Sequence, residues 1–360
     1  MSETADTFEN LKPPVTSVGF IGWIRNNLFN SPLNSFLTLL IFFILWKTVP
    51  PLFRWALVDS VWYGGNEPCT SASGACWSII PSNIRFITFG FYPAAEQWRP
   101  FAAMLLLFVL LVLSRNRNFW NTYLMYGWLA GLALMGILMR GGIFGLTSVE
   151  STQWGGLPLT LLLSVFGLTA AYPLGVLLAL GRQSEMPAIK SLCIVYIELI
   201  RGVPLISLLF MSAVIFPLFL PEGVSINKII RAQAAIILFT AAYIAEVVRG
   251  GLQAIPKGQF EAADSIGLNY FQTMRLIILP QALKIVIPPT VSILISAFKD
   301  TSLVVIIALY DILKTTQSTL SNPKWMGYST EAYLFLALVY FFCCYFMSTW
   351  SRRLERELST

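Results

Sequence analysis

The sequence predicts an all-α integral membrane protein with about eight transmembrane helices. Of its 360 residues, 56% are hydrophobic and 12% are charged, with a mean hydropathy of +0.69. A soluble domain carries roughly 25% charged residues, so this composition indicates a membrane protein. The aromatic share of 14% fits belts of Trp and Tyr at the membrane surfaces.

Eight segments approach the ~20 mostly apolar residues that a spanning helix requires. They are Leu33–Phe53, Phe101–Leu113, Thr122–Met139, Leu157–Leu180, Leu192–Leu220, Ile229–Val248, Ile285–Leu309 and Ala332–Trp350. The second is short unless Trp98-Arg99-Pro100 forms its beginning. The fifth is interrupted by Arg201-Gly202-Val203-Pro204. The seventh carries Pro288-Pro289 and Lys299-Asp300, which makes it too long and too irregular for one straight helix.

An even number of spans places both termini on the same side of the membrane. The short loops on that side are richer in Lys and Arg than those on the other side, which favours the cytoplasm for both termini. Residues 1–32 are mainly polar and lack the basic start and apolar run of a cleavable signal, so we expect a cytoplasmic tail. The chain then divides into an accessory block of three helices with a large outer loop, residues 33–150, and a five-helix core, residues 151–360.

Several kinds of chemistry find no support in the sequence. Histidine is absent, which removes the commonest metal ligand and the usual general base near neutral pH. No phosphate-cradling G-x-x-x-x-G-K-[ST] run occurs. We therefore expect no catalytic residue, no metal site, no cofactor in this chain and no nucleic-acid partner. A membrane enzyme would need a convergent acid–base or metal constellation, and the acidic residues are scattered.

Cys69 and Cys76 lie in the predicted outer loop, which would face an oxidising compartment. A disulfide closing a small loop is plausible there, and two free thiols are the alternative. The remaining three cysteines fall in apolar segments, where they fit ordinary packing.

The loop between the sixth and seventh spans, residues 250–284, is polar but patterned for structure. Residues 257–266 predict a short helix after Pro256, closed by Gly267. Asn269 with Gln272 three residues later predicts a capping box and a second short helix ending at Leu279, before Pro280. Ala262 and Ala263 would give the first helix a flat surface for a partner. An amphipathic helix lying on the membrane is the alternative.

Seven spaced residues in this loop resemble the signature of permease subunits of bacterial ABC importers. They are Glu261, Ala262, Ala263, Gly267, Ile277, Leu279 and Pro280. The resemblance implies a type I importer core in which this loop is the coupling helix, fitting a cleft on the ATP-hydrolysing subunit. The residues assigned to that contact are Glu261, Ala262, Ala263, Asp264, Gly267, Leu268 and Pro280.

Flanking motifs narrow the resemblance to polar amino acid permeases, over residues 155–350. They are Tyr196–Leu205, Glu246–Leu252, Ile255–Gln259, Pro280–Leu283 and Lys299–Leu303. One departure is Val203, where the subfamily usually has Thr. In the N-terminal part, residues 75–77, 91–93, 96–100 and 154–157 are similar to the M-type permeases of general L-amino acid uptake, which carry three extra N-terminal helices.

The resemblance implies a multi-pass protein of the bacterial inner membrane that forms half of an amino acid pathway. Its partners would be a second, homologous permease, a homodimer of ATPase subunits that binds ATP and Mg, a periplasmic amino acid-binding protein and membrane lipid. A stand-alone secondary transporter is the alternative. That class predicts paired repeats, and no long repeat is visible in the sequence.

Charged residues within the predicted spans are candidates for the substrate path or its gate, because such residues are costly and usually functional. Glu198 and Arg201 are spaced to pair on one helix face, either as a gate or as a structural lock. Lys299, Asp300, Thr301 and Ser302 could complement a zwitterionic amino acid. Alternatively, they cap a helix break and pair with one another.

Overall fold

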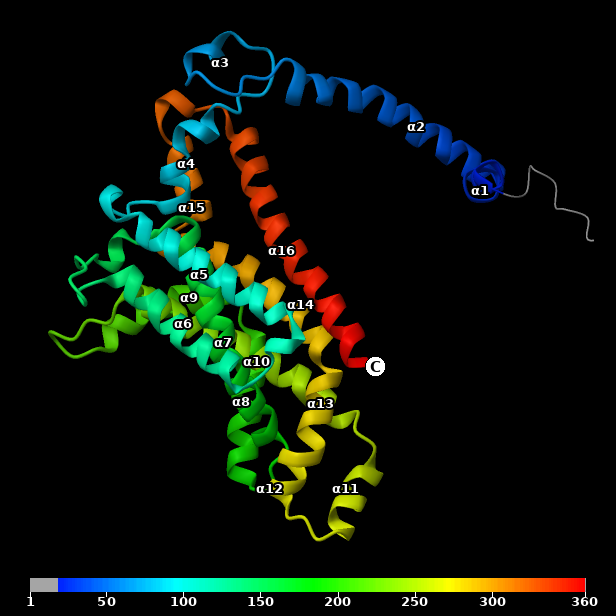
Figure 1. Ribbon diagram of the computed structural model, residues 1–360, viewed down its shortest axis with the longest axis vertical. Helices are drawn as coiled ribbons and strands as arrows, with labels where there is room; N and C mark the ends of the chain where they lie inside the picture. The colour runs from blue at the N-terminus through cyan, green and yellow to red at the C-terminus, as the bar shows by residue number, and fades with distance from the viewer. Residues whose placement is uncertain (1–18, 360) are drawn as a thin grey trace, which may run out of the picture. The chain divides into compact units, whose positions relative to one another are not determined.

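The computed structural model describes residues 19–359, and the chain is almost entirely helical (Figure 1). Residues 1–18 of the predicted tail lie outside the described part. The chain divides into two compact units, Met1–Ser78 and Ile79–Thr360, which we describe separately.

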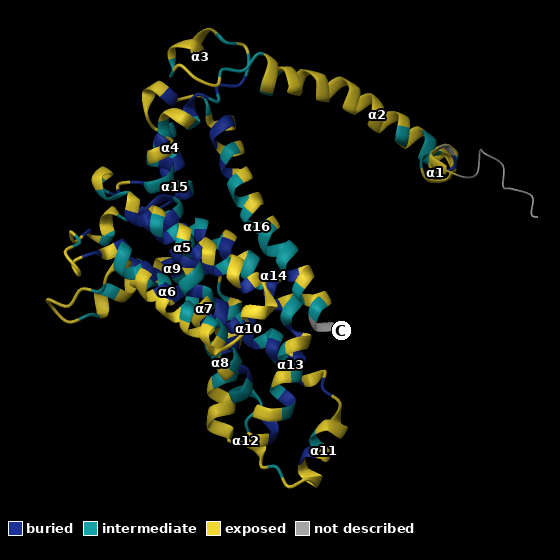
Figure 2. Cartoon of the chain, in the orientation of Figure 1, coloured by how far each residue is buried: buried dark blue, intermediate teal, exposed yellow. Residues whose placement is uncertain are grey.

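The first unit contains one long apolar helix. Helix α1 spans Gly19–Leu28, and α2 spans Pro32–Phe53, continuing into a π-helical turn over Arg54–Val58. Ser31 begins α2, because its hydroxyl accepts from the backbone N–H of Asn34 at 3.2 Å. Pro50 and Pro51 lie inside the helix without ending it. No residue of α2 is buried, and Figure 2 shows it exposed along its length.

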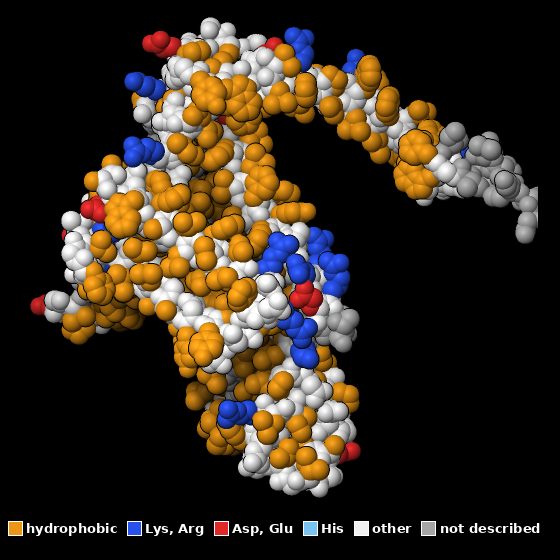
Figure 3. Space-filling view, in the orientation of Figure 1, with side chains coloured by type: hydrophobic (Ala, Val, Ile, Leu, Met, Phe, Trp, Pro, Cys, Tyr) orange, Lys and Arg blue, Asp and Glu red, His pale blue; other side chains and the backbone are white. Residues whose placement is uncertain are grey.

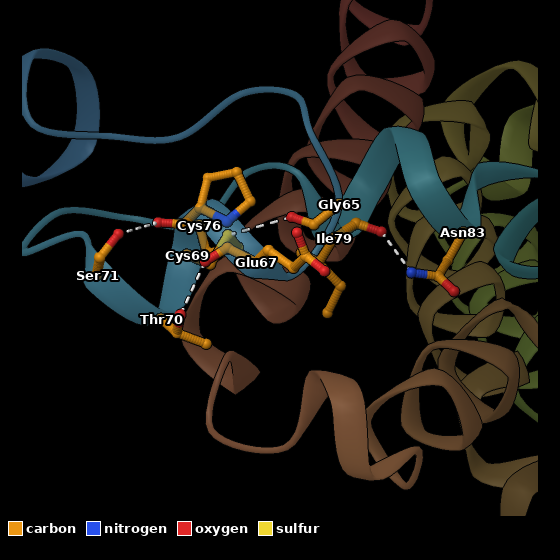
Figure 4. Close-up of a disulfide and its surroundings, with 9 residues drawn as sticks. Gly65, Glu67, Cys69, Thr70, Ser71, Cys76, Ile79 and Asn83 are labelled. Carbon is orange, nitrogen blue, oxygen red and sulfur yellow. Dashed lines mark hydrogen bonds between the residues drawn. A yellow bond between two sulfur atoms is a disulfide. The ribbon is translucent and has the colours of Figure 1, made fainter.

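A disulfide closes the loop that follows α2 (Figure 4). It joins Cys69 of α3 (Glu67–Ser71) to Cys76, with Cα atoms 5.5 Å apart. Trp77 donates its indole N–H to the Ala56 carbonyl at 2.7 Å and stacks on Trp62, with ring centroids 5.8 Å apart. These contacts bind both ends of the loop to the end of the α2 segment.

The second unit begins at Ile79 and holds the remaining helices. The longer ones are α4 (Ile79–Phe89), α5 (Trp98–Arg115), α6 (Thr122–Arg140), α7 (Gly156–Arg182), α8 (Pro187–Gly202), α10 (Lys228–Gln253), α14 (Ile287–Asp300) and α16 (Ser329–Ser359). The shorter ones are α9 (Leu205–Phe210), α11 (Lys257–Ser265), α12 (Tyr270–Thr273), α13 (Leu279–Ile285) and α15 (Ile312–Leu320).

The predicted spans are confirmed in number. Among residues 19–359, seven helices are long and apolar enough to cross a membrane, and a bent pair brings the number to eight. The pair consists of α8 and the Leu205–Phe219 segment, and the chain bends by 103° between them. Pro204 causes this break, because it favours extended backbone at Val203 and cannot donate a helical hydrogen bond. The second span includes Trp98-Arg99-Pro100 as its first turn.

Helices α7 and α10 form the centre of the second unit, and both carry buried residues along much of their length. Small residues bring their backbones close together. A Cβ on Gly175 would lie 2.7 Å from side-chain atoms of Ile244 and 2.9 Å from the Ala241 carbonyl oxygen. Close backbone contact through small residues is the usual way in which membrane helices gain packing energy.

Helices α5 and α6 pack on α7. Ala103 and Leu107 of α5 form a buried cluster with Leu132 and Met135 of α6, against Phe166 of α7. Since α5 and α6 belong to the same compact unit as the core, the structure divides the chain after Ser78, whereas the sequence suggested a boundary at residue 150.

The segment after α14 does not remain α-helical. It tightens into a 3₁₀ helix over Thr301–Ile307 and turns at Ala308, whose φ of 54° is left-handed. Tyr310 and Asp311 then pair with Gly155 and Gly156 at the start of α7. The Asp311 carboxylate is fully buried, and its Oδ1 accepts from the Lys314 backbone N–H at 2.9 Å, which begins α15.

Candidate functional site

Two short helices after α10 form an elbow, which we define as residues 256–285. Helix α11 ends in a Schellman turn, in which the N–H groups of Gly267 and Leu268 donate to the carbonyls of Asp264 and Ala263, at 3.0 and 3.1 Å. Gly267 has a φ of +76°, a conformation that glycine adopts without strain. The predicted stop at Gly267 is therefore present.

The second half of the elbow starts at the predicted capping box. Asn269 Oδ1 accepts from the Gln272 N–H at 2.9 Å, and Gln272 Oε1 accepts from the Asn269 N–H at 3.0 Å. The predicted end at Leu279 is wrong, because the helix continues through a π turn, Met274–Ile278, into α13. Pro280 cannot donate to a carbonyl four residues earlier, and the wider turn before it accommodates that loss.

The elbow presents a mixed polar and apolar surface. Glu261, Ala262 and Asp264 are exposed, as are Gly267 and Pro280, and Leu268 is half-buried. Ala263 is fully buried, so the expected flat surface of two alanines is reduced to Ala262. Three large apolar side chains that were not among the predicted site residues lie beside them: Ile266, Tyr270 and Phe271 are 72%, 62% and 68% exposed. The sequence could have indicated their exposure, because they lie next to the predicted helix ends at Gly267 and Asn269.

The elbow is anchored to α10. Met274, Ile278 and Ala282 are buried in one cluster with Leu252 and Ile255 at the end of α10. Gly251 allows the closest approach, since a Cβ there would lie 2.3 Å from the Val286 side chain and 2.9 Å from the Ala282 carbonyl oxygen. The elbow and the end of α10 therefore form one packed unit.

Five charged side chains form a cluster where α7, α8 and α10 end. Glu246 receives a forked contact from Arg249, whose Nε lies 3.0 and 3.1 Å from its two oxygens. Arg182 of α7 and Arg201 of α8 also face Glu246, at 3.4 and 3.6 Å. Glu198 pairs with Arg182 at 2.8 Å. The partial negative charge of three helix C-termini favours this excess of arginine.

The predicted pairing of Glu198 with Arg201 is wrong, because their partners lie on neighbouring helices. Arg201 turns toward α10, where it contacts Glu246 and the face of the Tyr243 ring, with 5.6 Å between Cζ and the ring centroid. The i, i+3 spacing of Glu198 and Arg201 allowed a pair on one helix. The Arg201 guanidinium instead meets both a carboxylate and an aromatic ring on α10.

A cavity of about 320 Å³ lies between α9, α10 and α14. Its polar lining comes from Thr240 and Tyr243 of α10 and from Ser292, Ser296 and Asp300 of α14. The last three are spaced by four residues, so they form one stripe along a helix face. The spacing of four residues is visible in the sequence, although only Asp300 of the three was a predicted site residue.

The four candidate residues around Lys299 separate in space. Asp300 lines the cavity and is half-buried, whereas Lys299 is exposed and outside the lining. Among the described residues, no ion pair joins them. Thr301 is fully buried and donates its hydroxyl to the Phe298 carbonyl at 2.7 Å, and Ser302 is half-buried outside the cavity. Asp300 is therefore the member of this group that can meet a ligand in the cavity.

Comparison with known proteins agrees with this architecture. The chain is 46% identical over 344 residues to the inner membrane amino-acid ABC transporter permease protein YhdY of Escherichia coli, covering 94% of this chain and 93% of that protein. It is 38% identical to the glutamate/glutamine/aspartate/asparagine transport system permease protein BztC of Rhodobacter capsulatus, covering 96% and 95%.

A solved structure described as an amino acid ABC transporter with histidines aligns with a TM-score of 0.50 and 30% identity. The alignment covers 56% of this chain and 92% of that one. The second unit thus contains the permease core of a type I ABC importer, as the sequence predicted. Residues 171–360 match the model of the family described as binding-protein-dependent transport system inner membrane component. The chain therefore belongs to this family of inner membrane transport components, as an amino acid ABC transporter permease.

Proposed function

We propose that this permease supplies half of the translocation path of an ATP-driven amino acid importer and couples to its ATPase through the elbow. The observation that carries the proposal is the capped elbow itself. It fixes Glu261, Ala262 and Asp264 on an exposed face beside Ile266 and Phe271. A rigid protrusion with both acids and large apolar groups suits a protein cleft, because partner contacts need apolar anchors with a polar rim.

The contacts of the elbow supply a route for coupling. A homodimeric ATPase that binds ATP and Mg would close around the elbow of this chain and of a second, homologous permease. The elbow is packed on the end of α10, and α10 carries Glu246 of the charged cluster and Tyr243 of the cavity. Closure of the ATPase would thereby change the spacing of the helices around the cavity. A periplasmic binding protein would deliver the amino acid at the opposite end.

The cavity is the candidate substrate path within this chain. The Asp300 carboxylate matches the α-ammonium group of an amino acid, and the hydroxyls of Ser292 and Ser296 lie on the same stripe. At about 320 Å³ the cavity is at the lower end of the range for small-ligand sites, roughly 300–1,000 Å³. The relatives' names point to amino acids as substrates, and acidic amino acids and their amides are named for BztC.

A stand-alone secondary transporter is the less favoured function. In that case the elbow would have no partner, and transport would follow an ion gradient without ATP. Transport by the isolated chain in liposomes, driven by a proton or sodium gradient, would overturn the proposed function.

The coupling proposal is tested by stimulated ATP hydrolysis in liposomes containing the permeases, the ATPase and the binding protein. We expect Gly267→Asp to abolish the stimulation by substrate-loaded binding protein, because the side chain alters an exposed left-handed turn at the contact. Gly223→Asp is the matched control, since Gly223 is also exposed, has a φ of +83° and lies in the loop before α10. Full stimulation of the Gly267 variant, with normal assembly, would refute the coupling role.

The path proposal is tested separately. We expect Asp300→Asn to raise the amino acid concentration for half-maximal uptake at least tenfold while assembly and basal ATP hydrolysis stay normal. Lys299→Gln is the control, because that side chain lies outside the cavity lining. Unchanged uptake kinetics for several amino acids in the Asp300 variant would remove Asp300 from the path.

A further inference from the structure

Helix α1, the first element of the described chain, has two unlike faces. When successive residues turn by about 100°, four apolar residues fall within an arc of about 140°. They are Phe20, Trp23, Ile24 and Leu28. Phe20 and Trp23 are 76% and 56% exposed, and the other two are half-buried. The helix therefore presents large apolar side chains that the described residues of its unit leave largely uncovered.

The opposite side of α1 is polar. Arg25 and Asn26 lie there, and both are exposed. Asn27 lies within the apolar arc, but its side-chain amide donates to the Trp23 carbonyl at 2.9 Å, which satisfies one of its donors within the helix. An apolar face with aromatic residues, opposite a face that carries a basic residue, is typical of helices that lie in a membrane surface.

A tight turn joins α1 to the membrane span α2. Residues 29–31 separate the two helices, and Ser31 caps the start of α2. The Thr38 hydroxyl donates to the Leu28 carbonyl at 2.9 Å, which holds the end of α1 beside the second turn of α2. Figure 1 shows α1 nearly end-on, whereas α2 is seen along its length, so α1 runs across the direction of α2.

This turn fixes the depth of α1 in the bilayer. The span Pro32–Val58 has 27 residues. At ~1.5 Å per residue it measures about 40 Å, which exceeds the ~30 Å of the hydrocarbon core. Thr38 lies about 9 Å along the helix axis from Pro32. The end of α1 is therefore within about 9 Å of the beginning of the span, and surface helices bury their apolar face by roughly 5–10 Å.

We propose that α1 lies in the membrane surface at which α2 begins, with phospholipid covering its apolar face. The Trp23 indole lies at the level of the headgroups, where Trp is enriched in membrane proteins. Arg25, on the polar side, faces the phosphate groups. The lipid around α2 reaches α1, because no residue of α2 is buried and α1 is held against its second turn. Helix α1 thus gives the first unit a second attachment to the bilayer.

Spin labelling of the full chain tests this placement in vesicles of phosphatidylglycerol and phosphatidylethanolamine, with and without the partner subunits. The three free cysteines are replaced by Ala, and a label is attached at Ile24→Cys or, as the matched control on the polar side, at Asn26→Cys. Its collision rates are measured with oxygen, which concentrates in lipid, and with a water-soluble nickel chelate.

We expect the ratio of the oxygen rate to the nickel rate to be at least fivefold higher at Ile24 than at Asn26, because lipid covers only the apolar face. Equal ratios at the two positions would overturn the proposal. An Ile24 label that neither reagent reaches would also overturn it, because a protein would then cover this face.

A pair of substitutions tests what holds α1 at the surface. With the label at Ile24→Cys, Phe20→Glu should lower the ratio at least threefold, because a carboxylate on the apolar face favours water. Asn26→Glu is the matched control, since Asn26 lies on the polar side, and it should leave the ratio unchanged. An unchanged ratio in the Phe20 variant, or an equal fall in both variants, would show that the apolar face does not enter lipid.

Discussion

At the scale of single residues, Glu246 holds the charged cluster together. Three arginines from three helices face its two oxygens, and Glu198, the other acid of the cluster, is 55% exposed at its side chain. Removing the charge of Glu246 leaves three partly buried guanidinium groups with one exposed partner. Leaving a partly buried charge without its partner is costly, whereas removing both members of a pair is often tolerated.

We therefore expect Glu246→Gln to lower the thermal midpoint of the purified permease assembly by several degrees, corresponding to about 1–3 kcal/mol. Glu198→Gln should cost less, because that side chain is mainly solvated. The double variant Glu246→Gln with Arg249→Gln should recover part of the loss, which a double-mutant cycle measures. Strictly additive losses would show that the two side chains do not interact.

Asp311 gives the molecule a defined pH dependence. Burial raises the pKa of its carboxyl from 3.8 to about 6, although backbone N–H donors at the start of α15 act in the opposite direction. A raised pKa favours the protonated form in the folded state. This contribution to stability is present below about pH 4 and is lost as the pH rises through about 6.

The wild-type assembly should accordingly gain thermal stability between pH 7.5 and 5.5 relative to the Asp311→Asn variant, which does not titrate at this position. The window from pH 7.5 to 5.5 covers about 1 kcal/mol of this contribution, out of a total on the order of 3 kcal/mol. Melting curves in detergent at the two pH values measure the difference. Parallel pH dependence in both proteins would show that the Asp311 carboxyl does not have a raised pKa.

The individual contacts were only partly predictable from sequence. The i, i+3 spacing of Glu246 and Arg249 matches the observed pair, because both lie on one helix. The partners of Glu198 and Arg201 depend on how α7, α8 and α10 meet, which local spacing does not specify. For the same reason, Lys299 and Asp300 are neighbours in sequence but point to different surroundings, as adjacent helical residues do.

At the scale of helices, Arg99 joins the accessory pair α5 and α6. Its guanidinium is fully buried, donates to the carbonyls of Leu138 and Thr147 at 2.8 and 2.9 Å, and faces Glu96 at 3.5 Å. It thereby satisfies one carbonyl in the last turn of α6 and one in the loop that follows, which fixes that loop. Gly141 is required beside it, since a Cβ there would lie 2.3 Å from the guanidinium.

Replacing Arg99 with Met should loosen the loop of residues 141–149 while the core stays folded, because the lost hydrogen bonds reach only the last turn of α6 and the loop itself. Hydrogen–deuterium exchange of that loop should rise at least tenfold. The control is Arg85→Met, because Arg85 is exposed on α4. Unchanged exchange in the Arg99 variant would show that the guanidinium does not hold the loop.

Helix ends and helix spans differed in how well the sequence predicted them. Hydropathy located the eight spans, and the chemistry of Gly267 and of Asn269 with Gln272 located the caps of the elbow. Pro50 and Pro280 did not end their helices. A π turn follows Pro50 at Arg54–Val58, and another precedes Pro280 at Met274–Ile278. Pro50 lies in a membrane span, where the freed backbone groups find other partners. Pro280 lies outside the spans, and there the π turn before α13 accommodates the missing N–H.

At the scale of the whole molecule, the basic residues predict an orientation. The elbow, the end of α7 and the last turns of α16 all carry Lys or Arg. Figure 3 shows Lys and Arg side chains gathered near the end of α16. These segments should face the cytoplasm, with the loop of residues 141–150 on the other side.

Cysteine labelling in cells checks this orientation. In a chain whose three free cysteines, Cys193, Cys343 and Cys344, are replaced by Ala, Ser148→Cys should react with an impermeant maleimide in intact cells once the outer membrane is opened. Ser265→Cys should react only after the inner membrane is permeabilised, because the elbow would lie inside. The reverse pattern would invert the assigned orientation.

Helix α2 has no buried residue within the described structure, whereas α10 carries buried residues along much of its length. Its length and apolar composition are therefore enough for it to span a bilayer without packing on another long helix of its own unit. During synthesis, such a helix can leave the translocon and stay in the membrane before any later span exists. An α2 segment of shuffled sequence and the same composition should therefore still insert, because apolar composition and length decide insertion.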